Sequence, residues 1–151
     1  MSLISKILPP GNILCDLGAG SKQELFEALG LLFENRQQIP RKKVIDSLAT
    51  REKLGSTGLG QGIAIPHGRI KALREATGAF VKLKTPIPFD APDSQPVGLL
   101  FILLVPAQAT DMHLQILGEL AQMFSDRKLR EHLQASQDPV EIHRLLSEWP
   151  R

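Results

Sequence analysis

The chain has 151 residues, of which 42% are hydrophobic and 23% are charged. Single domains commonly span about 100–200 residues, so we expect residues 1–151 to form one domain with its own core. One cysteine, Cys15, excludes an internal disulfide and favours a reducing, cytoplasmic location. The net charge of +2 and the lack of tyrosine argue against nucleic-acid binding. No apolar run approaches the roughly 18 residues of a membrane-spanning helix.

The first third of the chain predicts one strand and two helices. Residues 13–17 have the apolar character of a short strand. Ser21 and Glu24 form a capping box, which marks the start of a helix. This helix places a set of apolar residues on one face: Leu25, Phe26, Leu29, Leu32 and Phe33. A second helix, 41–51, is expected to bury Val44, Ile45 and Leu48, with the cations at residues 41–43 on a solvated surface.

The middle of the chain predicts strands separated by irregular segments. Residues 55–62 contain too many glycines for a helix or a regular strand, so we expect a loop there. Three segments predict strands, namely 63–65, 78–83 and 97–105. The last of these is almost wholly apolar, as in strands covered on both faces. Residues 85–96, punctuated by proline, connect the last two strands.

The C-terminal third predicts helices at 112–124, at 126–135 and from Asp138 onward. Helical spacing in the first of them predicts a core-facing set: Leu114, Leu117, Leu120, Ala121 and Phe124. The last helix is expected to pack a second set: Ile142, Leu145, Leu146 and Trp149. Strands mixed with helices without strict alternation predict an α/β fold with α+β character, in which helices cover the faces of a mixed sheet.

The glycine-rich segment is a candidate anion site. Ser56 and Thr57 offer hydroxyl donors, and Gly58, Gly60 and Gly62 let the backbone approach an anion closely. Taken alone, such a segment is as consistent with a flexible surface loop. Its spacing matches neither of the glycine motifs that bind nucleotides, so ATP and NAD are unsupported and we expect no cofactor.

His67 is the candidate nucleophile. It lies between Pro66 and Gly68, directly after the predicted strand 63–65, where the backbone is restrained but the ring can reach solvent. Neutral imidazole is a competent nucleophile near pH 7, and a phosphorylated ring nitrogen can pass its group on. The residues alone leave open a plain surface or core histidine.

The other histidines and the cysteine give no sign of a metal site. His132 and His143 fall on polar faces of predicted helices, and we interpret both as solvated. Cys15 lies in a predicted strand, where it is a small core residue. None of these residues has the spacing of zinc ligands, so no metal is expected.

Residues 51–68 closely resemble the phosphorylation motif of the fructose–mannitol type EIIA proteins of the phosphoenolpyruvate-dependent phosphotransferase system. The similarity continues through residues 95–97, 99–101, 103–106 and 113–114, and its nearest branch is the nitrogen-regulatory EIIA proteins. It implies one three-layer domain, with a mixed sheet of about five strands between helices. The chain departs from the family in lacking an acidic residue at 106–110 and in having Gly98 at a usually polar position.

The resemblance implies that His67 is phosphorylated and that Arg51 and His113 complete the active site. Ser56, Thr57, Gly58, Gly60 and Gly62 are assigned to the phosphoryl group by position. The donor would be the phosphocarrier HPr or its relative NPr, and the bound targets would be transporters or sensor kinases of potassium transport and nitrogen metabolism. A sugar-specific EIIA that passes the group to an EIIB is the alternative. No EIIB or EIIC segment follows Arg151, which favours the regulatory branch.

Overall fold

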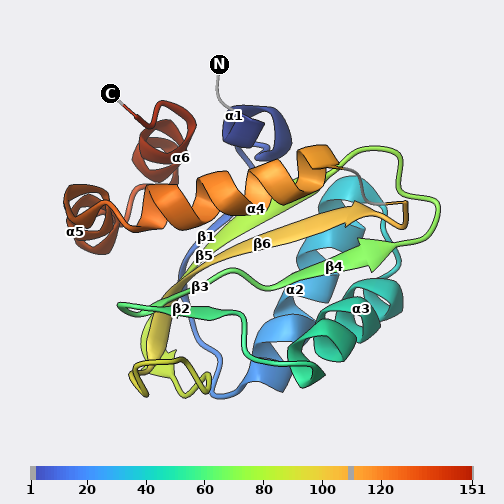
Figure 1. Ribbon diagram of the computed structural model, residues 1–151, viewed down its shortest axis with the longest axis horizontal. Coiled ribbons are helices and arrows are strands. Elements are labelled where there is room, and N and C mark those ends of the chain that lie inside the picture. Colours follow the sequence, from blue (N-terminus) through green and yellow to red (C-terminus); the bar gives the residue numbers. More distant parts are fainter. Residues whose placement is uncertain (1–2, 109–110, 151) are drawn as a thin grey trace.

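A mixed six-stranded sheet forms the centre of the protein (Figure 1). The computed structural model describes residues 3–108 and 111–150. The strands are β1 (Ile13–Leu17), β2 (Gly58–Gly60), β3 (Ile63–Ala64), β4 (His67–Ile70), β5 (Thr77–Ile87) and β6 (Val97–Pro106). The helices are α1 (Leu3–Ile7), α2 (Lys22–Gln37), α3 (Arg41–Lys53), α4 (Asp111–Phe124), α5 (Arg127–Ala135) and α6 (Pro139–Ser147).

Helices cover both faces of the sheet, so the expected three-layer arrangement is confirmed. Helices α2 and α3 pack on one face, whereas α1, α4, α5 and α6 pack on the other (Figure 1). Successive residues of a strand point to opposite faces. Phe101 of β6 therefore lies in the core beneath α4, while Leu100 and Ile102 lie in the core beneath α2 and α3.

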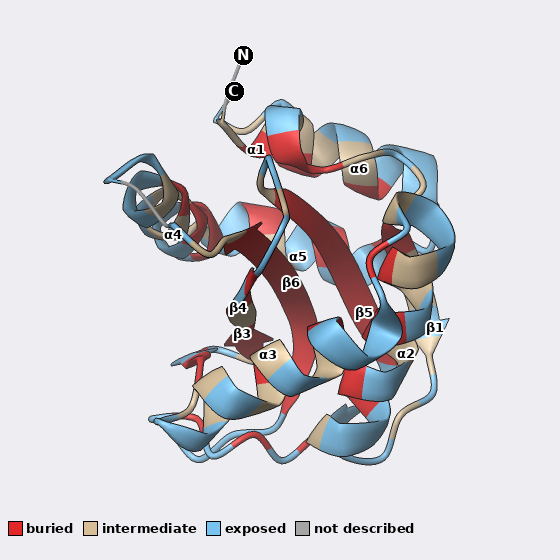
Figure 2. Ribbon diagram, turned by 90° about the vertical axis from the view of Figure 1, so that its right-hand side faces the viewer, coloured by how far each residue is buried: buried red, intermediate tan, exposed pale blue. Residues whose placement is uncertain are grey.

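Strand β6 organises the sheet. The strand order is β1-β5-β6-β3-β2, and β4 also pairs with β6. Strand β5 runs antiparallel to β6, whereas β3 and β4 run parallel to it, one after the other along the same edge. Residues 97–105 are buried throughout, which confirms the prediction of a strand covered on both faces (Figure 2).

The prediction that residues 55–62 contain no regular strand was wrong. Strand β2 lies within this segment and pairs antiparallel with β3. Gly60 and Gly62 adopt φ angles of 91° and 78°, and such positive values allow the chain to reverse tightly between the two strands. Pairing with a buried neighbour thus overrides the weak strand preference of glycine.

Other boundaries also differ from those expected. Strand β5 continues beyond residue 83 to Ile87, and α1 was not predicted. In α4, Leu114 is 68% exposed, whereas Ile116, Leu120, Met123 and Phe124 form the buried face. Because α4 carries apolar residues around much of its circumference, spacing alone did not identify the face that packs. In residues 3–108 and 111–150, no helix combines the length and apolar character needed to cross a membrane.

Lys82 attaches the C-terminal end of α5 to the sheet. It lies on β5, is only 8% exposed, and its Nζ donates hydrogen bonds to the carbonyl oxygens of Gln134 and Ser136. Carbonyls at a helix C-terminus have no partner within the helix. The buried ammonium therefore supplies donors that the end of α5 would otherwise lack.

We expect Lys82→Met to lower the free energy of unfolding by about 1–3 kcal/mol, because buried carbonyl groups lose their charged partner. Chemical denaturation followed by circular dichroism measures this loss. Lys84→Met is the matched control, since Lys84 lies on the same strand but is exposed. Equal stability of the two variants would contradict the role assigned to Lys82.

Candidate active site

His67 follows the short strand β3 and is itself the first residue of a further strand, β4. The backbone leaves the sheet after Ala64 and rejoins it at His67, which starts β4 opposite Leu103 of β6. Pro66, which has no N–H group, lies in the gap, and its carbonyl oxygen accepts a hydrogen bond from the Leu103 N–H at 3.0 Å. His67 thus lies after the expected short strand, and the structure adds strand β4, which was not predicted. The ring of His67 is half-buried, and the backbone that carries it is held in the sheet as the start of β4.

Two hydrogen bonds determine the protonation of the His67 ring. Nδ1 lies 2.9 Å from the carbonyl oxygen of Ile65. A carbonyl can only accept, so Nδ1 carries the proton. Nε2 lies 3.3 Å from Nε of Arg51, which can only donate, so Nε2 presents its lone pair. The ring is thus the neutral tautomer whose nucleophilic nitrogen is Nε2.

The surroundings favour this neutral ring. Burial lowers the pKa of the His67 imidazole, and the guanidinium of Arg51 lowers the same pKa further. The hydrogen bond to Ile65 and the carboxylate of Glu52 act in the opposite direction without reversing the shift. His67 therefore keeps its lone pair at a pH where a free imidazole is already partly protonated.

Close packing between α3 and β4 brings Arg51 to His67. A Cβ atom on Gly68 would lie 2.1 Å from Ser47 Oγ and 3.1 Å from the Ser47 backbone carbon, so only glycine allows α3 to approach this closely. Ser47 Oγ donates to the Arg69 carbonyl oxygen at 2.9 Å. Arg51 follows Ser47 by four residues and hence lies on the same face of α3. Its Nη1 also donates to the Gly55 carbonyl oxygen at 2.9 Å, which fixes the plane of the guanidinium.

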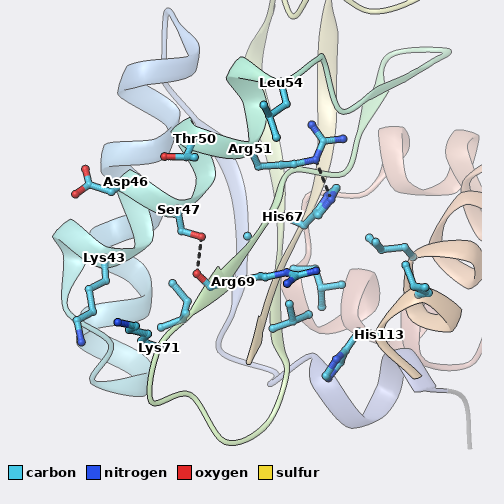
Figure 3. Close-up of a pocket in the computed structure, with 16 residues that line it drawn as sticks. Lys43, Asp46, Ser47, Thr50, Arg51, Leu54, His67, Arg69, Lys71 and His113 are labelled. Carbon is cyan, nitrogen blue, oxygen red and sulfur yellow. Dashed lines mark hydrogen bonds between the residues drawn. The ribbon is translucent and has the colours of Figure 1, made fainter. Parts of the chain in front are cut away.

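A surface pocket of about 760 Å³ unites the three main candidates (Figure 3). His67, Arg51 and His113 all line it, the last from the first turn of α4. Sequence reasoning missed the further cations of this pocket: Lys43, Arg69 and Lys71. Arg69 follows His67 by two residues on β4 and therefore points to the same side of the strand. A predicted strand at 67–70 would have revealed it.

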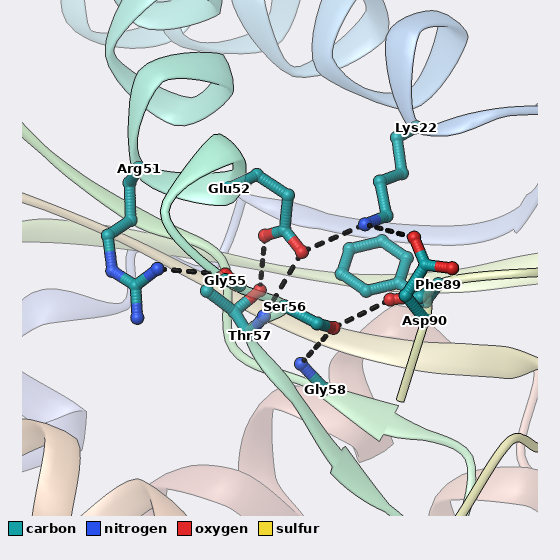
Figure 4. A network of polar contacts seen from close by, with 9 residues as sticks. All are labelled: Lys22, Arg51, Glu52, Gly55, Ser56, Thr57, Gly58, Phe89 and Asp90. Atoms are coloured by element: carbon teal, nitrogen blue, oxygen red, sulfur yellow. Dashed lines mark hydrogen bonds and ion pairs between the residues drawn. The ribbon is translucent and has the colours of Figure 1, made fainter. Parts of the chain in front are cut away.

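The structure does not bring the predicted loop donors to this pocket. None of Ser56, Thr57, Gly58, Gly60 and Gly62 is among the residues that line it. Ser56 Oγ donates to the Phe89 carbonyl oxygen at 2.6 Å and accepts from the Gly58 N–H at 3.0 Å. Thr57 Oγ1 donates to Glu52 at 2.7 Å (Figure 4). Both hydroxyl groups therefore have partners in neighbouring segments of the chain, and their assignment to a phosphoryl group stays a prediction.

The remaining predictions concern residues outside the pocket. His132 is exposed, as expected. His143 is half-buried and its Nε2 lies 2.8 Å from the Leu8 carbonyl oxygen, so the prediction of a solvated ring was wrong. Cys15 packs against the core beside α4, and burial raises the pKa of its thiol. Gly98 does not line the pocket. In the segment 106–110, where the family's acidic residue is lacking, residues 109 and 110 lie outside the described residues.

The lowered pKa of His67 predicts a specific dependence of stability on pH. Below the reference value of 6.5 the unfolded chain takes up a proton at His67, while the folded chain does not until the pH reaches the lower folded pKa. The free energy of unfolding therefore decreases as the pH falls from 6.5 through that window. Denaturation at a series of pH values and an NMR titration of the ring measure it.

His67→Gln is the control for this prediction, because glutamine does not titrate. We expect the variant to lose the part of the pH dependence that arises at this site. A titration midpoint for His67 at or above 6.5 in the folded protein would contradict the prediction.

Comparisons with known proteins identify the family of the chain. Residues 6–149 match the family model for the EIIA 2 component of the phosphoenolpyruvate-dependent sugar phosphotransferase system. The chain is 44% identical over 130 residues to a nitrogen regulatory protein of Escherichia coli, covering 85% of this chain and 79% of that protein. It is 36% identical to one of Pseudomonas aeruginosa, covering 97% and 96% of the two chains.

A solved structure extends the likeness to three dimensions. The nitrogen regulatory protein IIA-Ntr of Neisseria meningitidis superposes with a TM-score of 0.90 at 50% identity, covering 96% of this chain and 99% of that chain. The family match covers most of the chain, and the relatives named here share one description. The chain therefore belongs to the EIIA 2 family of the phosphotransferase system, with the nitrogen regulatory proteins among its relatives.

Proposed function

We propose that the protein accepts a phosphoryl group on Nε2 of His67 from a phosphocarrier of the HPr or NPr type. The observation that carries the proposal is the orientation of the ring. Nδ1 is held by the Ile65 carbonyl at 2.9 Å, and Nε2 faces the Arg51 guanidinium at 3.3 Å, in a pocket lined by further cations. Such a ring offers one nitrogen to an incoming group.

The transfer step follows from this arrangement. The Nε2 lone pair of His67 attacks the phosphorus atom, and the bond between phosphorus and the donor's histidine nitrogen breaks as the new N–P bond forms. The electron pair of the broken bond returns to the donor nitrogen. His67 gains positive charge while Nδ1 keeps its proton, and the Ile65 carbonyl stabilises that charge through the existing hydrogen bond.

Cations of the pocket stabilise the transferred group. Charge in such a transfer gathers on the three equatorial oxygens, so catalysis depends on positioning and electrostatics. Arg51 would exchange its contact with Nε2 for contacts with these oxygens, and its planar fork suits two of them at once. His113 lies in the first turn of α4, whose positive end favours an anion beside it.

The biological role proposed here is regulatory. Relatives named nitrogen regulatory protein support a part in nitrogen regulation. We propose that the protein controls nitrogen metabolism and potassium transport by binding target proteins, with phosphorylation of His67 selecting the target. We propose that the protein acts together with these phosphocarriers in the cytoplasm. The alternative is a sugar-specific EIIA that passes its group to an EIIB. The family description names a sugar system, which is the observation in support of that alternative.

We expect phosphoenolpyruvate, Enzyme I and HPr or NPr to label the chain once with acid-labile phosphate, and His67→Ala to abolish the label. NMR of the labelled protein should place the phosphorus on Nε2, since Nδ1 is engaged by Ile65. Label that persists in His67→Ala, or phosphorus on Nδ1, would refute the assigned site. Transfer of the label to an EIIB would favour the sugar-specific alternative.

Rates of labelling test the two supporting residues. Arg51→Lys keeps the charge but loses the fork, and His113→Ala removes a donor, so we expect each to slow transfer about ten- to a hundredfold. Arg127→Lys and His132→Ala are matched controls on exposed positions of α5. An unchanged rate in either site variant would remove that residue from the mechanism. Stopped transfer in a control would show that the slowing is not specific to the site and would likewise contradict the assignment.

A further inference from the structure

We infer that Glu52 is a positioning residue for phosphoryl transfer, whose carboxylate closes the 53–56 loop and thereby aims Arg51 at His67. The inference rests on the proposed function, because it concerns the rate at which His67 takes the phosphoryl group. Glu52 itself does not line the pocket. It follows Arg51 in α3, and its side chain is only 6% exposed.

The Glu52 carboxylate accepts three hydrogen bonds. Oε1 accepts from Thr57 Oγ1 at 2.7 Å, and Oε2 accepts from the Thr57 backbone N–H at 3.1 Å and from Lys22 Nζ at 3.0 Å (Figure 4). A buried carboxylate is tolerated only when it is paired and hydrogen-bonded. These three donors, one of them a charged ammonium group, meet this requirement. Two of them belong to Thr57, so Glu52 holds that residue by both its hydroxyl group and its backbone N–H.

The two hydrogen bonds between Glu52 and Thr57, here called the clamp, determine where the Gly55 carbonyl group points. Residues 53–56 connect Glu52 to Thr57, so holding Thr57 against Glu52 closes them into a tight turn. Gly55 has a φ of 153° in that turn, a value that residues with a side chain rarely adopt. Its carbonyl oxygen then meets Arg51 Nη1 at 2.9 Å, while Arg51 Nε meets His67 Nε2 at 3.3 Å.

A second set of contacts anchors the clamp to the rest of the fold. Lys22, near the start of α2, also lies 3.4 Å from Asp90 and 4.5 Å from the ring centroid of Phe89. Ser56 Oγ donates to the Phe89 carbonyl oxygen at 2.6 Å. The loop between β5 and β6 thus contacts both Lys22 and the 53–56 turn. The orientation of Arg51 therefore depends on contacts among α2, this loop and the turn.

A purely structural role for Glu52 is the competing explanation, and the chain offers a matched control for it. Glu34 accepts hydrogen bonds from the backbone N–H and Nε of Arg41 at 3.0 and 2.9 Å, at the other end of α3. Glu34→Gln and Glu52→Gln therefore each release one end of the same helix. Only Glu52 is connected to Arg51 through the turn.

The experiment compares Glu52→Gln, Glu34→Gln and Thr57→Val with the unaltered protein. The glutamine NH₂ group cannot accept a hydrogen bond, so Glu52→Gln breaks the clamp with little change in shape. We expect it to slow phosphoryl transfer to His67 about tenfold, Thr57→Val to slow it less, and Glu34→Gln to leave the rate within about twofold. Denaturation curves establish that each variant folds.

NMR provides a readout that needs no phosphoryl donor. In the unaltered protein the Arg51 Nε–H should give a distinct, slowly exchanging signal because it bonds to His67 Nε2. Loss of that signal in Glu52→Gln and its retention in Glu34→Gln would support the inference. An unchanged signal in Glu52→Gln, or equal slowing by both variants, would overturn it. If no protein in the series is labelled, the proposed function fails, while the signal still decides the role of Glu52.

Discussion

The site depends on one neutral imidazole held between a carbonyl oxygen and a guanidinium. The Ile65 carbonyl fixes the proton on Nδ1, and Arg51 approaches the opposite nitrogen at 3.3 Å. Neither contact alone would suffice. A carbonyl without the cation would leave Nε2 free to take up a proton, and a cation without the carbonyl would leave the tautomer undefined. Burial adds to the cation's effect, because it disfavours the charged ring.

The fold serves this contact through irregularities in an otherwise regular sheet. The edge of β6 carries two short parallel partners instead of one long strand, and Pro66 lies where they meet. That interruption lets the Ile65 carbonyl leave the ladder and turn to the ring of a residue two positions later. Gly68 then allows α3 to pack closely against β4, so an arginine from a separate helix reaches the same nitrogen.

The sequence predicted the parts of the site that local patterns encode. Pro66-His67-Gly68 marks a restrained histidine, the capping box predicted the start of α2, and Ser21 Oγ does accept from the Glu24 N–H at 3.2 Å. The layered fold and the buried β6 followed from apolar patterning. Strand β2 was missed because it is only 3 residues long and two of them are glycines, which have a weak strand preference. Strand β4 was missed because it has only 4 residues and pairs with the distant strand β6. Arg69 was missed with β4.

The loop hydroxyls show what residue type alone does not reveal, namely the partners that these groups have in the folded chain. Ser56 and Thr57 are good anion donors in isolation, and the glycines around them suggest a phosphate loop. Their hydrogen bonds to Phe89 and Glu52 instead rigidify the turn that carries Gly55, and Gly55 orients Arg51. Under the proposed function, the charge offered to a phosphoryl group comes from long cationic side chains around a surface pocket. A donor protein could approach such a pocket, whereas a closed cradle of backbone amides would enclose its ligand and exclude the donor.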